Sequence, residues 1–112
     1  MDNLYAKLPP TTSAEEEFRQ LLARPGIRIE RIVSTGQASP PGFWYDQPDG
    51  EWVLLLQGAA HLRFADEAQA RSLEAGDYVD IAPRRRHRVD WTSRDPATLW
   101  LAVHYACPPT PE

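Results

Sequence analysis

The chain has 112 residues, enough for one domain with a single core and too few for two. Its net charge of −4 argues against a general polyanion binder, because nucleic-acid-binding proteins usually carry a basic surplus. A single cysteine, Cys107, excludes an internal disulfide and fits a reducing compartment. The apolar runs fall far short of the roughly 20 residues that span a bilayer, and no secretory signal is visible. We therefore expect a cytoplasmic protein that binds neither membranes nor nucleic acid.

Residues 1–26 predict an irregular arm followed by one short helix. Ser13 and Glu16 have the spacing of a capping box, in which each side chain bonds a free backbone amide of the first helical turn. The apolar stripe of this helix would be formed by Phe18, Leu21 and Leu22. A proline–glycine pair at 25–26 would end it. We interpret the glutamates at 15–17 as a solvated helix start, favoured by the helix dipole, rather than as a binding site.

Residues 27–106 predict a barrel domain of about eight strands, because turn signals recur about every eight to twelve residues, as in an antiparallel sandwich or barrel. β-Branched residues alternate with polar ones from Ile27 onward. This alternation slips at Arg31 and Ile32, where we expect a β-bulge. Residues 107–112 are rich in proline and predict a loose C-terminal tail.

The strand predicted at residues 51–57 is the centre of this fold. Its side chains alternate between two faces, one with Glu51, Val53, Leu55 and Gln57 and the other with Trp52, Leu54 and Leu56. Both faces are largely apolar, so both need to be covered. One face would fill the interior of the barrel. The other would be covered by the N-terminal helix, the N-terminal arm or a second subunit, and we therefore expect a homodimer.

Two short motifs lie in and after this strand. Glu51 is followed seven residues later by Gly58, where the apolar run ends. Gly76 leads through another short strand to Pro83 and then to His87. In order and separation these residues resemble the two motifs of the small single-domain cupins. The resemblance implies a jelly-roll β-barrel.

The resemblance covers roughly residues 36–105 and departs from the family at the metal motif. Metal-binding cupins hold one ion with a His-x-His pair, the glutamate of the first motif and the histidine of the second. The His-x-His positions fall on Trp44 and Asp46, and arginines replace the glycine that usually follows the second-motif proline. The resemblance thus leaves Asp46, Glu51 and His87 as potential ligands of a divalent iron, manganese, nickel or zinc ion.

His104 would add a second nitrogen ligand if its face of the last strand points inward. That strand carries Trp100, Ala102 and His104 on one side and Leu99, Leu101, Val103 and Tyr105 on the other. The sequence leaves open which side is the interior. A core histidine bonded to a backbone carbonyl is the competing interpretation. Glu51 and His87 could likewise bond each other with no metal between them.

Aromatic and basic residues complete the candidate site. A small-molecule pocket would be lined by Trp44, Asp46, Glu51, His87 and Trp91. Core packing is the alternative interpretation for both tryptophans. An anion-binding rim at the barrel mouth would be formed by Arg84, Arg85 and Arg86, because a guanidinium group binds two oxygens at once. A solvated loop paired with nearby acidic residues is the alternative for these arginines.

Two functional hypotheses follow. The first is a small-molecule-binding barrel with its pocket around Glu51 and His87, degenerate in the usual metal motif. The second, implied by the resemblance, is a metal-dependent enzyme of dioxygenase or isomerase type that uses Asp46 as a further ligand. A metal-free acid–base pair of Glu51 and His87 would also allow catalysis. The sequence names no ligand or substrate, and it does not decide between an enzyme and a binding protein.

Overall fold

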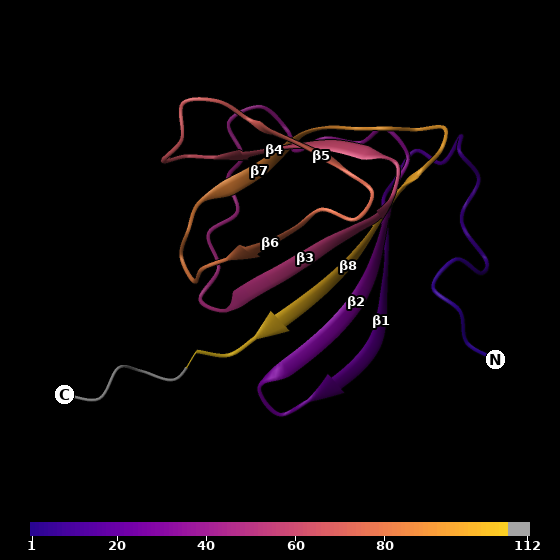
Figure 1. Cartoon of the computed structure of the whole chain (residues 1–112), viewed down its shortest axis with the longest axis horizontal. Coiled ribbons are helices and arrows are strands. Elements are labelled where there is room, and N and C mark those ends of the chain that lie inside the picture. The colour runs from indigo at the N-terminus through magenta and orange to yellow at the C-terminus, as the bar shows by residue number, and fades with distance from the viewer. Residues whose placement is uncertain (108–112) are drawn as a thin grey trace.

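The computed structural model describes residues 1–107, in which every regular element is a β-strand (Figure 1). The strands are β1 (Glu17–Arg24), β2 (Ile27–Ser34), β3 (Gly50–Gln57), β4 (Ala59–Phe64), β5 (Arg71–Glu74), β6 (Tyr78–Ile81), β7 (His87–Thr92) and β8 (Thr98–Tyr105). Within residues 1–107 there is no helix with the length and hydropathy needed to cross a membrane. The predicted tail lies outside the described residues, apart from Cys107, which is exposed.

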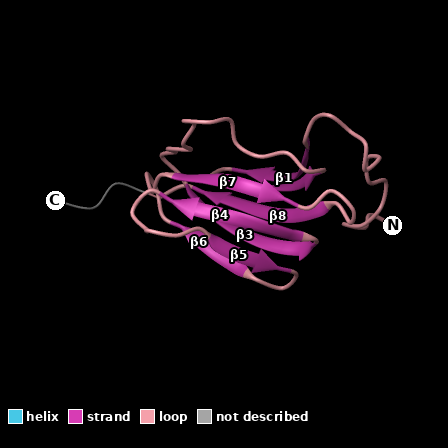
Figure 2. Cartoon of the chain, turned by 90° about the horizontal axis from the view of Figure 1, so that it is seen from above, coloured by secondary structure: helices cyan, strands magenta, loops and turns pink. Residues whose placement is uncertain are grey.

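The strands form two antiparallel sheets that face each other (Figure 2). The larger sheet has the order β1-β2-β8-β3-β6, and the smaller has the order β5-β4-β7. The main apolar core lies between them and comprises Val53, Leu55, Ala60, Leu62, Phe64, Leu73, Val79, Ile81, Trp100 and Ala102. The prediction of a mostly β sandwich or barrel is therefore confirmed.

β3 and β8 lie side by side in the larger sheet and pair without a shift from Gly50 to Leu55. Glu51, Val53 and Leu55 face the interior, as predicted. The prediction for Gln57 is wrong, because the register shifts after Leu55 and pairs Gln57 with Leu99, which belongs to the cluster on the outer face. On β8 the inner face carries Trp100, Ala102 and His104, which decides the orientation that the sequence left open. Glu51 pairs with His104, and His104 pairs with Arg28 of β2. One row of the sheet therefore brings three ionisable side chains to the interior.

The helix predicted near the start of the chain is wrong. Residues 17–24 form β1, which pairs with β2 from Glu17 opposite Val33 to Arg24 opposite Ile27. The free edge of β2 offers backbone groups that need partners. This pairing outweighs the capping signal, because helix propensities differ by less than about 1 kcal/mol per residue for ordinary side chains.

The bulge expected in β2 lies instead in its neighbour. β2 pairs with β8 without a shift along its whole length. The register shift occurs in β1, between Gln20 and Leu22. The break in the alternation of apolar and polar residues at Arg31 therefore has a different cause. Arg31 is a charged residue at a covered position of the outer face, where it is only 1% exposed.

A bulge in β7 turns Trp91 away from the interior. On β4, His61 pairs with Trp91 and Leu62 pairs with Val89, so β7 contains one extra residue, Asp90. His87 and Val89 line the interior, before the bulge. Trp91, after it, is 44% exposed and lies beside the ring of His61.

The N-terminal arm covers part of the outer face of the larger sheet. Leu8 packs against a second buried cluster, formed by Val33, Ala97 and Leu99. Arg31 donates hydrogen bonds to the backbone carbonyls of Leu4 and Ala6, at 3.2 and 2.6 Å. This buried guanidinium group ties the arm to β2.

Gly58 and Gly76, the motif glycines, provide a matched test of this fold. Both have positive φ angles, +84° and +96°, which cost an L-residue about 1–2 kcal/mol. A Cβ on Gly58 would lie 2.8 Å from the carbonyl oxygen of Ala97 and 2.9 Å from Cα of Thr98, whereas one on Gly76 would meet nothing within 4 Å. We expect Gly76→Ala to lower the free energy of unfolding by about 1–2 kcal/mol and Gly58→Ala to lower it clearly more. Equal losses in urea denaturation would contradict the tight packing at Gly58.

The homodimer stays a prediction, and the outer face of the larger sheet is where we expect the contact. Trp52, Leu54 and Leu101 are only partly buried there. Light scattering at micromolar concentration should give the mass of a dimer. Leu54→Glu should give a monomer, because a charge would then lie inside the contact, whereas Ser72→Glu on the exposed side of β5 should not. A monomeric wild-type protein would contradict the prediction.

Candidate functional site

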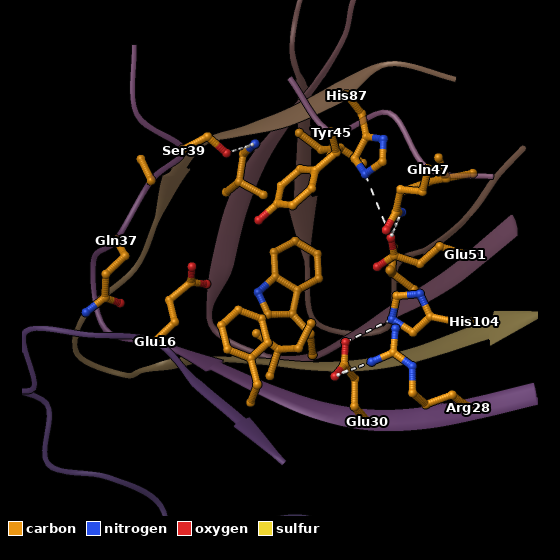
Figure 3. A pocket seen from close by; sticks show the side chains of 18 of the residues that line it. Glu16, Arg28, Glu30, Gln37, Ser39, Tyr45, Gln47, Glu51, His87 and His104 are labelled. Atoms are coloured by element: carbon orange, nitrogen blue, oxygen red, sulfur yellow. Dashed lines mark hydrogen bonds and ion pairs between the residues drawn. The ribbon is translucent and has the colours of Figure 1, made fainter. Parts of the chain in front are cut away.

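A cavity of about 220 Å³ lies between the two sheets, and polar side chains point into it (Figure 3). The larger sheet lines it with β1, β2, β3 and β8, the smaller sheet with β4 and β7, and the segment at 37–47 closes one side. This segment is tied to β7, because Tyr45 and His87 exchange two backbone hydrogen bonds of 2.7 and 3.2 Å. The strand predicted at 43–46 is reduced to this single bridge.

His87 opens β7 and is 4% exposed. Its Nδ1 lies 2.9 Å from the backbone carbonyl oxygen of Arg85. A carbonyl oxygen only accepts hydrogen bonds, so Nδ1 carries a proton and, in the neutral ring, Nε2 carries the lone pair. Nε2 faces the carboxylate of Glu51 at 3.8 Å (Figure 3). The backbone thus fixes which nitrogen of His87 is free to act.

Glu51 lies at the start of β3 and is 9% exposed. Its Oε1 accepts a hydrogen bond from Nε2 of Gln47 at 2.8 Å, an uncharged donor. The same oxygen lies nearest to His87. Glu51 and His87 are therefore neighbouring groups inside the cavity, at a distance that leaves the Nε2 lone pair without a direct hydrogen bond.

A second carboxylate in the cavity, Glu30, is fully partnered. Its Oε1 lies 2.8 Å from Nε2 of His104, and its Oε2 accepts a hydrogen bond from Arg28 at 3.2 Å. A carboxylate accepts, so Nε2 of His104 carries a proton. Glu30 and His104 are buried, whereas the side chain of Arg28 is 46% exposed. The contact with Glu30 uses the nitrogen that His104 would otherwise offer to a ligand.

Tyr45 packs against His87, with the two rings stacked and their centroids 5.2 Å apart. Its hydroxyl group points into the cavity (Figure 3). Burial raises the pKa of this phenol, and the negative charges of Glu16, Glu51 and Glu30 raise it further. At neutral pH Tyr45 is thus a hydrogen-bond donor that faces the same space as His87.

The sequence-predicted pocket residues fall into two groups. Glu51, His87 and His104 line the cavity. Trp44 lies elsewhere, beneath the guanidinium groups of Arg86 and Arg88, and Trp91 lies on the outside beside His61. Asp46 is half-exposed and pairs with Arg84 at 3.4 Å.

The arginines predicted to form an anion rim do not line the cavity. Arg84 faces Asp46, as above. Arg85 forms ion pairs with Asp66 and Glu67, at 3.0 and 2.9 Å, and lies over the ring of Phe64. The loop is thus held mainly by its own acidic neighbours, as in the alternative interpretation.

The donor set does not fit the metal ion that the family resemblance implies. Among residues 1–107, no three His, Cys, Asp or Glu side chains are grouped so as to hold a metal ion. Asp46 points away from the cavity, and Nε2 of His104 is bonded to Glu30. Glu51 and His87 remain as neighbours, and two donors are fewer than the three protein ligands of a typical catalytic zinc site.

The cavity-lining residues that sequence reasoning missed include Glu16, Arg28, Glu30 and Tyr45. The local pattern indicates a solvated helix start at Glu16, but this residue lies just before β1 and accepts a hydrogen bond from Oγ of Ser34 at 2.6 Å. The alternation of Arg28, Glu30 and Ile32 on one face of β2 was a usable signal. Which face is internal follows only from the pairing with β8.

Two tyrosines should titrate late. The pKa of Tyr105 is raised to about 12 by its hydrogen bond to Asp80, and that of Tyr45 is raised by burial. Both folded-state pKa values lie above those of the unfolded chain, so this stability is present below about pH 10 and is lost as pH rises toward 12. Absorbance titration should show two phenol groups that ionise above the ordinary pH range of tyrosine in the wild type, and one such group in Tyr45→Phe. Asp80→Asn should lower the pKa of Tyr105 only. Four tyrosines that all titrate near pH 10 would contradict this.

Comparison with known proteins identifies relatives of this chain among solved structures. A candidate mannose-6-phosphate isomerase from Ralstonia eutropha JMP134 is 44% identical, with a TM-score of 0.92 over 96% of this chain and 98% of that one. No protein-family model matches the sequence, and no curated protein matches it.

More distant structures share the fold. An RmlC-like cupin from Shewanella frigidimarina NCIMB 400 has a TM-score of 0.69 at 12% identity, over 86% of this chain and 80% of that one. The iron(II) form of HppE has a TM-score of 0.66 at 14% identity, over 80% of this chain and 50% of that one. With the Ralstonia relative matched over nearly its whole length, and with the two sheets and motifs described above, the chain belongs to the family of small single-domain cupins.

Proposed function

We propose that the protein binds a small polar organic molecule between its two sheets, and that His87, with Glu51 beside it, exchanges a proton with that molecule. The observation that carries the proposal is the orientation of His87. Its Nδ1 proton is held by the carbonyl of Arg85 at 2.9 Å, so the Nε2 lone pair is directed to the cavity. When Nε2 takes a proton from a ligand, the carboxylate of Glu51, 3.8 Å away, stabilises the resulting imidazolium ion.

Tyr45 supports this chemistry as the complementary donor. Its phenol remains protonated at neutral pH, because burial raises its pKa. A hydroxyl donor next to a base in one small cavity suits proton transfer beside a carbonyl group, since the carbonyl oxygen gains negative charge as the neighbouring carbon loses its proton. The isomerisation of a hydroxy-aldehyde to a hydroxy-ketone is such a reaction, and the name of the Ralstonia relative points to the same class.

The size of the cavity bounds the ligand. Its volume of about 220 Å³ is below the roughly 300–1,000 Å³ of sites for drug-sized molecules. The walls combine apolar side chains from both sheets with a few polar groups, the usual composition of a small-molecule site. We therefore propose a ligand of monosaccharide size or smaller.

Deuterium exchange into a panel of simple carbonyl compounds tests the proposal. Glyceraldehyde, dihydroxyacetone, mannose and fructose would each be incubated with the protein in D₂O, and exchange at the carbon next to the carbonyl followed by NMR. At least one should exchange faster with the wild type, with a bell-shaped pH profile. His87→Gln should slow this exchange by at least about 100-fold, because general base catalysis contributes that much.

His61→Gln is the matched control, because His61 is an exposed histidine on the outer side of β4. It should exchange at the wild-type rate. Exchange that survives in His87→Gln, or that is absent for every compound, would show that His87 does not act as the base.

A metal-dependent enzyme, of dioxygenase or isomerase type, is the second candidate. Glu51 and the free Nε2 of His87 are the groups that would hold a divalent iron, manganese, nickel or zinc ion, and the fold is shared with the iron(II) protein HppE. Such an ion would act as a Lewis acid or bind oxygen. Because residues 1–107 supply only these two neighbouring donors, we rank this candidate second.

Elemental analysis separates the two candidates. The untagged protein, purified without chelators, should contain far less than one metal ion per chain, because the third protein ligand of a typical site is missing from the described part of the chain. Near-stoichiometric iron, manganese, nickel or zinc that is lost in His87→Ala would reverse the ranking.

A further inference from the structure

The charges in the cavity indicate what kind of ligand it takes. Three carboxylates line it, from Glu16, Glu30 and Glu51, with one guanidinium group, from Arg28. Glu30 takes up that guanidinium group and the N–H of His104. The other two carboxylates have uncharged hydrogen-bond donors: Oγ of Ser34 at 2.6 Å for Glu16, and Nε2 of Gln47 at 2.8 Å for Glu51. The cavity is therefore lined by more carboxylates than guanidinium groups.

Within residues 1–107, the guanidinium group that lines the cavity is already paired with a carboxylate. The cavity-lining residues include a single arginine and no lysine, and Arg28 is engaged by Glu30 at 3.2 Å. The arginines of the 84–86 loop lie outside the cavity. A phosphate or carboxylate group entering this space would therefore meet like charge and no unpaired guanidinium group.

Two polar groups that line the cavity have no hydrogen-bond partner among residues 1–107, and they point to a polar ligand independently of the acids. Trp100 is 5% exposed and lines the cavity, yet its indole N–H donates no hydrogen bond within residues 1–107. Nε2 of His87, in a side chain 5% exposed, likewise has no partner among these residues closer than 3.8 Å. A bound molecule with an acceptor atom for the indole N–H and a donor atom for Nε2 would satisfy both groups.

We propose that the cavity selects a small, hydroxylated, protonated amine, such as an amino sugar or an amino alcohol, whose ammonium group is held by Glu16. The hydroxyl groups of the ligand would serve the indole N–H of Trp100 and Nε2 of His87. The rings of Tyr45 and Trp100 line the same space and favour a cation over an anion through their π faces. This inference rests on the proposed function, because it names the ligand class of the same cavity.

Two matched series of probes test the charge of the ligand. Glucosamine, glucose and glucose phosphate form the first, and serinol, glycerol and glycerol phosphate form the second. Binding would be measured by calorimetry and by the indole N–H signals of the four tryptophans, with that of Trp100 assigned from Trp100→Phe. In at least one series we expect the amine to bind roughly tenfold or more tightly than the neutral compound. This difference in affinity is about what one charge-assisted hydrogen bond contributes. The phosphate should bind more weakly than both.

The variant Glu16→Gln tests the role of this carboxylate charge in amine binding, and Glu15→Gln is its control. The first keeps the shape of a cavity-lining side chain and removes its charge, whereas Glu15, its neighbour in sequence, is exposed and lines no part of the cavity. Glu16→Gln should abolish most of the preference for the amine and leave the affinity for the neutral compound within about twofold. Glu15→Gln should leave both affinities unchanged.

The outcomes separate this inference from the function on which it rests. A phosphate or neutral compound that binds as tightly as the amine, and that shifts the Trp100 signal, would overturn the charge selection and leave the cavity as a ligand site. An amine preference that persists in Glu16→Gln would also overturn it. If no compound of either series shifts the Trp100 signal, both the inference and the proposed small-molecule site fail.

Discussion

The backbone pairing between Tyr45 and His87 is the constraint on which the site depends. Its two hydrogen bonds join the long segment before β3 to the start of β7 and close one side of the barrel. They also set the phenol against the imidazole ring, while the carbonyl of Arg85 holds Nδ1. The ring is thus held at one face and one edge, and only Nε2 is left to meet a ligand. The chemistry open to His87 follows from this backbone geometry as much as from its neighbour Glu51.

The parts of the fold that the sequence predicted are those in which one strand is buried on both sides or ends at a glycine. β3 shows a regular alternation because Glu51, Val53 and Leu55 face one interior, and Gly58 follows where the chain passes between sheets. The position of His87 follows from the second motif in the same way. For His104 two faces were open from the sequence, and the pairing of β8 with both β2 and β3 was needed to choose between them.

The failures share a physical cause, namely interactions between residues that are distant in sequence. The local signal of a helix cap at Ser13 and Glu16 was real, but the free edge of β2 recruited this segment as a strand and carried Glu16 to the cavity. Similarly, one extra residue in β7, Asp90, turned Trp91 outward. A period of two locates the inner face of a strand only as far as the next bulge. Neither the strand with which a segment pairs nor the position of a bulge could be predicted from this single sequence.

The cavity-lining carboxylates that have no cationic partner affect both the stability of the fold and the selectivity for ligands. Glu30 shows how the protein compensates a buried carboxylate, with Arg28 and His104 within hydrogen-bond distance. Glu16 and Glu51 receive hydrogen bonds only from uncharged donors. For Glu51, which is 9% exposed, a buried charge without an opposite charge destabilises the folded state. A ligand that supplies the missing charge removes that cost when it binds, and it stabilises the fold by about 2.7 kcal/mol at a concentration one hundred times its Kd. Under the proposed ligand class, the acids that lack an opposite charge in the empty barrel would also discriminate among ligands, because a cation supplies that charge and an anion does not.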